Sequence, residues 1–390
     1  MPIDIARARA ETPGCSQVLH FNNAGASLMP RPVVDAIKGH IDLEARIGGY
    51  EAANCEQSRW ERAYDAVAEL LRCARDEVAI VENATRAWDM AFYAVPLKAG
   101  DRILTARAEY VSNYLAFLQV AQRTGAVVEV VPSDETGQLD VEALRRMMDA
   151  RVKLIAVTHI PTNGGLVNPV EEIGAVARAA GVLYLVDACQ SAGQMPLDVE
   201  RIGCDMLSAA GRKFLRGPRA TGFLYVRRSA LERLEPPFVD LHAASWTGPD
   251  SYAWCGDARR FENWETNCAT KIALAVAVDY ALGWGLEAIR ERTFGLAARL
   301  RERLRAIPGA RTHDLGRVQS GIVTFTIEGR EALALKAALL AQRINVTVSR
   351  VEFARLDMGA RGLERMVRAS PHYYNTEDEV DRFVEVLRGL

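Results

Sequence analysis

The clearest signal of the fold begins with the segment from Val182 to Gln190, Val-Leu-Tyr-Leu-Val-Asp-Ala-Cys-Gln. It resumes from Asp205 to Pro218, Asp-Met-Leu-Ser-Ala-Ala-Gly-Arg-Lys-Phe-Leu-Arg-Gly-Pro. The short apolar run that opens each part is typical of a strand covered on both faces of a sheet. The first strand ends at the carboxylate of Asp187, and the second is followed by the amine of Lys213. Because ligands bind beyond the carboxyl ends of strands in open α/β sheets, we expect both side chains at one site.

Outward from this stretch, short apolar runs alternate with longer segments of helical periodicity, and such alternation predicts a mainly parallel sheet in an α/β fold. After about residue 285 the pattern changes to that of a smaller α+β unit. We therefore expect a large domain over residues 16–285 and a small C-terminal domain over residues 286–390, which includes the N-terminal segment 1–15. The seven expected strands of the large domain are 78–81, 102–106, 127–131, 154–158, 182–186, 205–209 and 222–226, with helices at 87–94, 111–124, 141–149 and 169–180.

Composition excludes several classes of protein. The 390 residues carry 48 basic and 50 acidic side chains, a formal charge of −2, which argues against a protein that coats nucleic acid or an anionic membrane. No uncharged apolar run is long enough to span a bilayer, and residues 1–17 do not resemble a signal peptide. Seven cysteines without a C-x-x-C pair indicate reduced thiols, and six histidines show no metal-binding spacing. We expect a cytoplasmic protein with no metal, no nucleic-acid partner and no membrane partner.

The residues at the strand ends predict a pyridoxal 5′-phosphate site. This cofactor needs an amine for its aldehyde and an anion beside its ring nitrogen, and Lys213 and Asp187 offer both. It also needs a phosphate cup, and residues 83–85, Asn-Ala-Thr, follow a strand and open a helix whose N-terminus favours an anion. Arg212 adds positive charge nearby. Each of these features, taken alone, is commonly a helix cap or a surface side chain. Their occurrence together at strand ends favours a site for the cofactor.

These motifs resemble the core of the class V aminotransferase-like enzymes. They are pyridoxal-phosphate proteins of fold type I, and they include cysteine desulfurases, selenocysteine lyase, isopenicillin N epimerase-like proteins and C–S lyases. The resemblance extends from Phe21–Gly25 to Arg368–Thr376, nearly the whole chain. It implies a small amino-acid substrate and a homodimer with shared active sites, in which Thr266 reaches the phosphate bound by the second subunit.

The resemblance also implies a role for individual residues. Lys213 would bond to the cofactor aldehyde and remove the α-proton of the substrate, and Asp187 would pair with the pyridine nitrogen. Tyr110 stands where the family usually has a histidine, and its ring can stack on the cofactor. The other implied cofactor contacts are Ala84, Thr85 and Arg212 at the phosphate, and Thr162, Asn163 and Gln190 near the phenolic oxygen; the implied substrate contacts are Asn23, Tyr50 and Arg368, whose fork would grip the α-carboxylate.

The prediction of the reaction depends on a cysteine that this sequence lacks. Cysteine desulfurases carry a nucleophilic cysteine shortly before the position of Arg368, and residues 345–368 contain none. The sequence therefore favours a β-eliminating C–S lyase acting on a cysteine-derived substrate. Alternatives are an amino-acid epimerase, with Tyr110 or His372 as a second acid or base, and an aminotransferase or oxidative deaminase. A cysteine desulfurase is less expected because that cysteine is missing. A non-catalytic binding protein is also less expected, because Lys213, Asp187 and Arg368 are all present.

Overall fold

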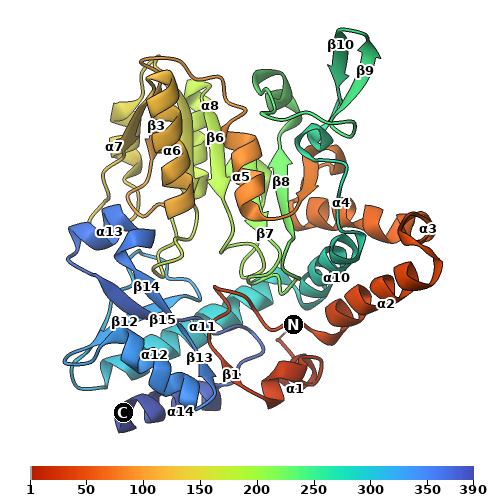
Figure 1. Cartoon of the computed structure of the whole chain (residues 1–390). Helices are drawn as coiled ribbons and strands as arrows, with labels where there is room; N and C mark the ends of the chain where they lie inside the picture. The colour runs from red at the N-terminus through yellow and green to blue at the C-terminus, as the bar shows by residue number, and fades with distance from the viewer. Residues whose placement is uncertain (1) are drawn as a thin grey trace.

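The computed structural model describes residues 2–390, which build a large and a small β-sheet (Figure 1). The large sheet has seven strands in the order β2-β8-β7-β6-β5-β3-β4. β8 runs antiparallel to both of its neighbours, and the other neighbouring strands are parallel. The strands are β2 (Val78–Val81), β3 (Arg102–Thr105), β4 (Val127–Val130), β5 (Val152–Thr158), β6 (Leu183–Asp187), β7 (Met206–Ala210) and β8 (Gly222–Val226).

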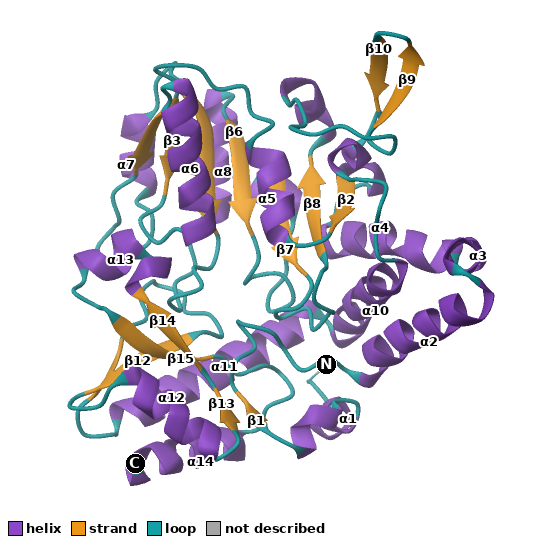
Figure 2. Ribbon diagram, viewed as in Figure 1, coloured by secondary structure: helices purple, strands orange, loops and turns teal. Residues whose placement is uncertain are grey.

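Helices cover both faces of this sheet, so its strands are apolar on both sides. One core lies under α5 (Ala84–Phe92) and α6 (Val111–Thr124). The opposite core lies under α4 (Gln57–Leu71), α7 (Val141–Met147), α8 (Val170–Ala180), α9 (Val199–Ile202) and α10 (Cys268–Trp284). Successive strand residues alternate between the two cores, as Ile103 and Leu104 do. Figure 2 shows the resulting layers of helix, sheet and helix.

The N-terminal third contributes helices that the sequence did not predict. α2 (Arg31–Ile47), α3 (Gly49–Cys55) and α4 follow one another, and α10 packs against α2 and α4. The short helix α1 (Ile5–Ala10) precedes them, and an exposed hairpin of β9 (Ala244–Gly248) and β10 (Ser251–Trp254) projects from the segment before α10. These elements flank the large sheet and do not extend it.

The small sheet is antiparallel, with strands in the order β11-β12-β15-β14. Its core also takes in a parallel pair of short strands, β1 with β13, which brings residues 19–20 against the C-terminal part of the chain. The domain division at residues 285 and 286 stays a prediction. The elements are β1 (Leu19–His20), α11 (Leu286–Arg305), β11 (Ala310–Thr312), β12 (Val323–Ile327), α12 (Ala332–Ala341), β13 (Ile344–Asn345), β14 (Thr347–Arg350), α13 (Arg355–Ala360), β15 (Arg365–Ala369) and α14 (Glu377–Gly389).

The predicted α/β fold with a mainly parallel sheet is confirmed. The helix expected over residues 169–180 starts one residue later: α8 begins after Pro169 without a side-chain cap, and the side chain of Asn168 bonds to the backbone of Leu139 and Thr158. Among residues 2–390, no single helix is long and apolar enough to cross a membrane. The pair α10 and α11, which meet at an angle of 80°, would be long and apolar enough only when counted as one segment. The described residues hold no cluster of three His, Cys, Asp or Glu side chains placed to bind a metal ion.

Candidate active site

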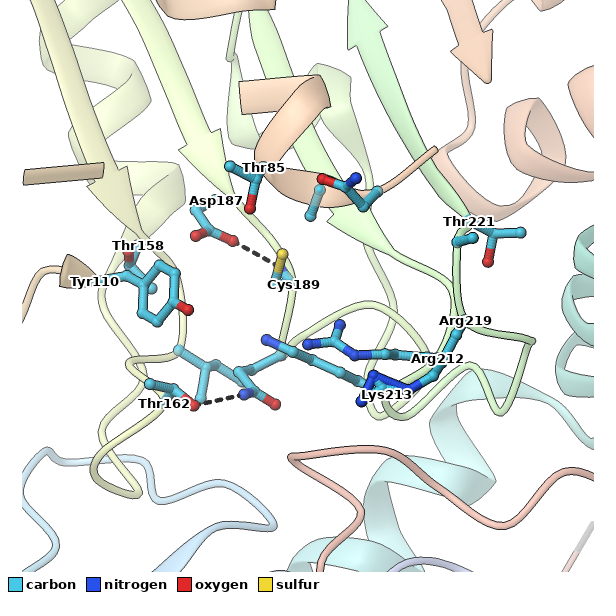
Figure 3. A pocket seen from close by; sticks show the side chains of 15 residues that line it. Thr85, Tyr110, Thr158, Thr162, Asp187, Cys189, Arg212, Lys213, Arg219 and Thr221 are labelled. Atoms are coloured by element: carbon cyan, nitrogen blue, oxygen red, sulfur yellow. Dashed lines mark hydrogen bonds between the residues drawn. The ribbon is translucent and has the colours of Figure 1, made fainter. Parts of the chain in front are cut away.

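A cavity of about 260 Å³ opens at the carboxyl ends of β5, β6 and β7 (Figure 3). It brings together most of the residues predicted for the cofactor, although they come from segments up to about 130 residues apart in the sequence. The predicted residues that line it are Asn83, Ala84, Thr85, Tyr110, Thr162, Asp187, Gln190, Arg212 and Lys213; Thr158, Ile160, Cys189, Arg219, Ala220 and Thr221 complete the wall.

Lys213 follows β7 and points into this cavity. No hydrogen bond within residues 2–390 engages its Nζ atom, although Asp187 and Cys189 line the same cavity. Burial, and then the positive charges of Arg212 and Arg368, lower the pKa of the Lys213 amine, while Cys189 and Asp187 oppose that shift. A lysine whose charge is disfavoured by burial is suited to bond covalently to an aldehyde.

Asp187 is the last residue of β6, and its carboxylate is held at both oxygens. Oδ1 accepts a hydrogen bond from the backbone nitrogen of Cys189 at 2.9 Å, and Oδ2 accepts one from Nδ2 of Asn113 at 3.0 Å. The side chain is 5% exposed. Each oxygen has a further acceptor position, so a buried, oriented anion is available to a pyridine N–H.

The N-terminus of α5 forms a cradle at the other end of the cavity. Asn83 caps this helix, because its Oδ1 accepts from the backbone nitrogen of Arg86 at 2.9 Å. Backbone N–H groups in the first turn of a helix have no partner within the helix and attract anions. A Cβ on Gly222 would lie only 2.5 Å from the carbonyl carbon of Asn83, so β8 approaches the cap closely. Thr85 and Arg212 complete a cradle whose shape and charge fit a phosphate.

Gln190 and Arg368 meet at Thr162 and each leaves one buried polar atom free. Nε2 of Gln190 donates to Oγ1 of Thr162 at 2.8 Å and to the carbonyl of Ala24 at 3.0 Å, and its Oε1 has no partner. Arg368 donates from Nη1 to the carbonyl and Oγ1 of Thr162, and its buried Nε has no partner. Buried polar atoms are rarely left unpaired in a protein interior. These two therefore fit the hydroxyl of a cofactor and the carboxylate of a substrate.

Arg368 does not line the cavity and hydrogen-bonds to its wall through Thr162, and five further predicted residues also lie outside the cavity. Asn163 lines a smaller adjoining cleft with Tyr110 and Thr162. Asn23 is fully buried and bonded to Ser370 and Tyr374, so its amide is occupied in the core. His372 bonds to the carbonyl of Phe214, so it does not supply an acid or base at the cavity. Tyr50 is 76% exposed on α3, and Thr266 is exposed just before α10. The binding roles of these residues remain predictions.

Several residues of the cavity wall are not predicted from the sequence, although their position at a strand end is a usable signal in one case. Thr158 ends β5, so the strand-end rule that found Asp187 also points to it, whereas Thr221 stands at the amino end of β8 and reaches the same edge because β8 runs antiparallel to β7. Cys189 lies within the quoted motif, but nothing in the local pattern shows that its side chain faces Lys213. Arg219 and Ala220 belong to a turn in which Ala220 has a positive φ of 58°, and that conformation brings the turn to the cavity.

Fold and site together define a pyridoxal-phosphate enzyme of fold type I, with the lysine after β7, the carboxylate at the end of β6 and the anion cradle at α5. Residues 19–383 match the family model described as aminotransferase class-V. The chain belongs to that family, and its cofactor is pyridoxal 5′-phosphate.

Several relatives of this chain are named probable cysteine desulfurases. A probable cysteine desulfurase from Xylella fastidiosa (strain 9a5c) is 32% identical over 384 residues, which cover 95% of this chain and 90% of the relative. A probable cysteine desulfurase from Pyrococcus abyssi is 28% identical, with 98% and 96% covered. The apo structure of a cysteine desulfurase from Thermococcus onnurineus NA1 has a TM-score of 0.91 at 28% identity, over 100% of this chain and 98% of that one.

These relatives contradict the predicted reaction. The expectation of a β-eliminating C–S lyase without the desulfurase cysteine is wrong, because the relatives and the neighbouring structure are cysteine desulfurases by name. The prediction gave decisive weight to the missing cysteine in residues 345–368. In the structure that segment forms β13, β14, a 3₁₀ turn, α13 and most of β15. A single missing residue in one connection does not determine the product.

Proposed function

We propose that this chain removes sulfur from cysteine and leaves alanine. One observation carries the proposal: the Lys213 amine, with its pKa lowered by burial, lies in a cavity that also presents Asp187 and Thr162, and Thr162 bonds to Arg368, whose buried Nε has no partner. This arrangement suits an α-amino acid, whose amine and carboxylate need separate partners. The names of the relatives support cysteine as that amino acid.

Each residue then has a defined task. When bound, pyridoxal phosphate supplies a ring that accepts electrons from the substrate. Asp187 holds a proton at the ring nitrogen, and Lys213 moves the proton of the substrate α-carbon. The planar fork of Arg368 binds the carboxylate. The remaining proposed cofactor contacts are Ala84, Thr85 and Arg212 at the phosphate, Tyr110 over the ring, and Thr162, Asn163 and Gln190 at its hydroxyl.

The sulfur needs an acceptor, and we assign that role to a thiol from solution. In the described part of the chain, Cys189 is the one cysteine that lines the cavity. Burial, and next the charge of Asp187, raise the pKa of its thiol, so it stays protonated and is a poor nucleophile. A dissolved thiol would take the sulfur atom to form a persulfide, while the carbon that loses sulfur gains a proton. Cysteine and one thiol thus become alanine and one persulfide.

The test incubates the holoenzyme with cysteine and dithiothreitol and measures alanine, sulfide and pyruvate. We expect alanine and sulfide in equal amounts, with a rate that rises with the dithiothreitol concentration. Cys189→Ala should keep this activity, whereas an essential acceptor role for Cys189 would abolish it. Pyruvate without alanine, or no product from cysteine, would contradict the proposal.

We also propose that two copies of the chain share their active sites. Exposed apolar side chains gather in residues 41–50 and 238–264, and the second stretch leads directly to Thr266. A monomer rarely leaves so many large apolar groups in water. These side chains are Ile41, Ile47, Tyr50, Phe238, Val239, Leu241, Trp246, Tyr252 and Trp264.

The shared site has its own test. We expect light scattering to give twice the mass of the chain, and Thr266→Ala to weaken cofactor binding about threefold through the loss of one hydrogen bond. Thr270→Ala, one turn into α10, is the matched control and should leave cofactor affinity unchanged. A monomer, or equal effects of both substitutions, would refute the shared site. A cytoplasmic location is likewise proposed, supported by seven cysteines that form no disulfide in residues 2–390.

A further inference from the structure

Glu109 is a buried carboxylate that the proposed reaction does not use. It lies four residues beyond the end of β3, is 4% exposed, and accepts hydrogen bonds from three elements. Oε2 accepts from the backbone nitrogen of Thr158 at 3.0 Å and from Oγ1 of Thr105 at 3.2 Å. Oε1 accepts from the backbone nitrogen of Tyr110 at 2.8 Å, from Oγ1 of Thr158, and from Asn113. With five donors around it, the carboxylate ties the ends of β3 and β5 to the start of α6.

Asn113 connects this carboxylate to the active site. Its Nδ2 donates to Oε1 of Glu109 at 3.0 Å and to Oδ2 of Asp187 at 3.0 Å. An amide nitrogen carries two hydrogens, so both are used and the amide is fixed between the two carboxylates. Tyr110 holds the N-cap position of α6, and Asn113 lies in the first turn of that helix. Its side chain is therefore free to reach the neighbouring strand β6.

We propose that Glu109 is a positioning residue for the cofactor ring: through Asn113 it fixes the carboxylate of Asp187, and through the backbone of Tyr110 it fixes the aromatic ring that faces the cavity. Both contacts originate at one oxygen, Oε1. Oε1 of Glu109 therefore positions both Asp187, at the nitrogen edge of the cofactor ring, and Tyr110, over one face of that ring. Neither contact reaches the substrate, so the role is distinct from those of Lys213 and Arg368.

The chemistry around Glu109 supports a role beyond simple packing. Burying a carboxylate is costly unless it is well paired. Burial raises the pKa of Glu109 to about 7 despite its five donors, and the charge of Asp187 adds to the rise. The other titratable groups near this chain of contacts are neutral: burial lowers the pKa of His159 to about 4 and raises that of the Cys189 thiol. A positively charged ring nitrogen at Asp187 would offset the repulsion between the two carboxylates.

The experiment removes the side chain of Asn113, which joins Glu109 to Asp187, and measures cofactor binding and cofactor absorption without relying on enzyme activity. Asn113→Ala frees Asp187 from Glu109, and the matched control is Asn168→Ala. Asn168 is a buried amide that bonds Leu139 and Thr158 without touching Asp187. Two quantities are measured: the dissociation constant of pyridoxal phosphate from the apoenzyme, and the midpoint of the pH titration of the bound cofactor's visible absorption.

We expect Asn113→Ala to weaken cofactor binding about tenfold, the effect of one hydrogen bond to a charged group. The absorption midpoint should rise, because a less firmly held ring proton lets the nitrogen of Lys213 accept its own proton more readily. Asn168→Ala should change neither quantity. If Asn113→Ala does not fold, Asn113→Leu fills the space and removes the same donors. Unchanged affinity and midpoint in the Asn113 variant, or equal shifts in the control, would overturn the proposal.

Discussion

Glu109 and His159 are both buried near the carboxyl end of β5, and burial shifts their pKa values in opposite senses. The pKa of Glu109 rises from 4.5 to about 7, and that of His159 falls from 6.5 to about 4. One pKa unit corresponds to about 1.4 kcal/mol, so each shift is linked to about 3 kcal/mol of folding free energy. The substitution Glu109→Gln in the cofactor-free chain removes the titrating carboxyl of Glu109, and with it the pH-dependent part of the folding free energy that this group contributes.

The sign follows from the proton count of each state. The folded chain holds the Glu109 proton up to about pH 7 while the unfolded chain loses it near pH 4.5, so this group's stabilisation is full below pH 4.5 and is lost as the pH rises to 7. His159 acts in the opposite direction. The unfolded chain binds its proton below pH 6.5 and the folded chain only near pH 4, so stability is lost as the pH falls from 6.5 to 4. Between pH 4.5 and 6.5 the two effects nearly cancel.

Urea unfolding of the apo form at a series of pH values tests this reasoning. The free energy of unfolding of Glu109→Gln, taken relative to the unsubstituted chain, should rise by about 3 kcal/mol from pH 4.5 to pH 7. For His159→Asn the same difference should fall by a similar amount from pH 4 to 6.5. Taking differences removes the contribution of all other titrating groups. Differences that stay flat with pH would refute the opposed shifts.

Two further predictions concern substrate and cofactor binding. Arg368→Lys should raise the KM for cysteine about tenfold or more, because an ammonium cannot reproduce the planar fork. Cofactor affinity should be unchanged, and Arg365→Lys on the exposed end of β15 is the control; an unchanged KM would remove Arg368 from substrate binding. Gly222→Ala should weaken cofactor binding about tenfold, since its Cβ would press on the Asn83 cap, whereas Gly39→Ala in α2 meets no atom within 4 Å and should have no effect. Equal cofactor affinities in the two glycine variants would exclude the α5 cradle.

The sequence predicts the large sheet well, because strands covered on both faces are apolar throughout. The predicted strands 78–81 and 222–226 and the helix 111–124 coincide with β2, β8 and α6. The helices α2 to α4 were not predicted, nor was the exposed hairpin β9-β10, whose side chains lack the alternation that marks a half-buried strand. The fold class depends on the interior, so these omissions did not alter it.

Some residues of the candidate site could likewise be predicted from the sequence, and others could not. Lys213 and Asp187 could be predicted because strand ends carry ligand-binding residues whatever the details of packing. The contact of Asn113 with Asp187 joins residues 74 positions apart and depends on how α6 lies over β6. Glu109 and Asn113 show only a spacing of four residues in the sequence. The placement of Cys189, and of the unpaired atoms on Gln190 and Arg368, likewise requires the tertiary structure.

The site of covalent cofactor attachment shows whether Lys213 is the lysine that holds pyridoxal phosphate. The holoenzyme is reduced with borohydride, digested, and searched by mass spectrometry for the lysine that carries the pyridoxyl group. Burial also lowers the pKa of Lys271, which is bonded to Tyr64 outside the cavity, so the chain contains its own competitor. We expect the label on Lys213 alone, and no visible absorption from Lys213→Ala. A label on Lys271, or none on Lys213, would contradict it.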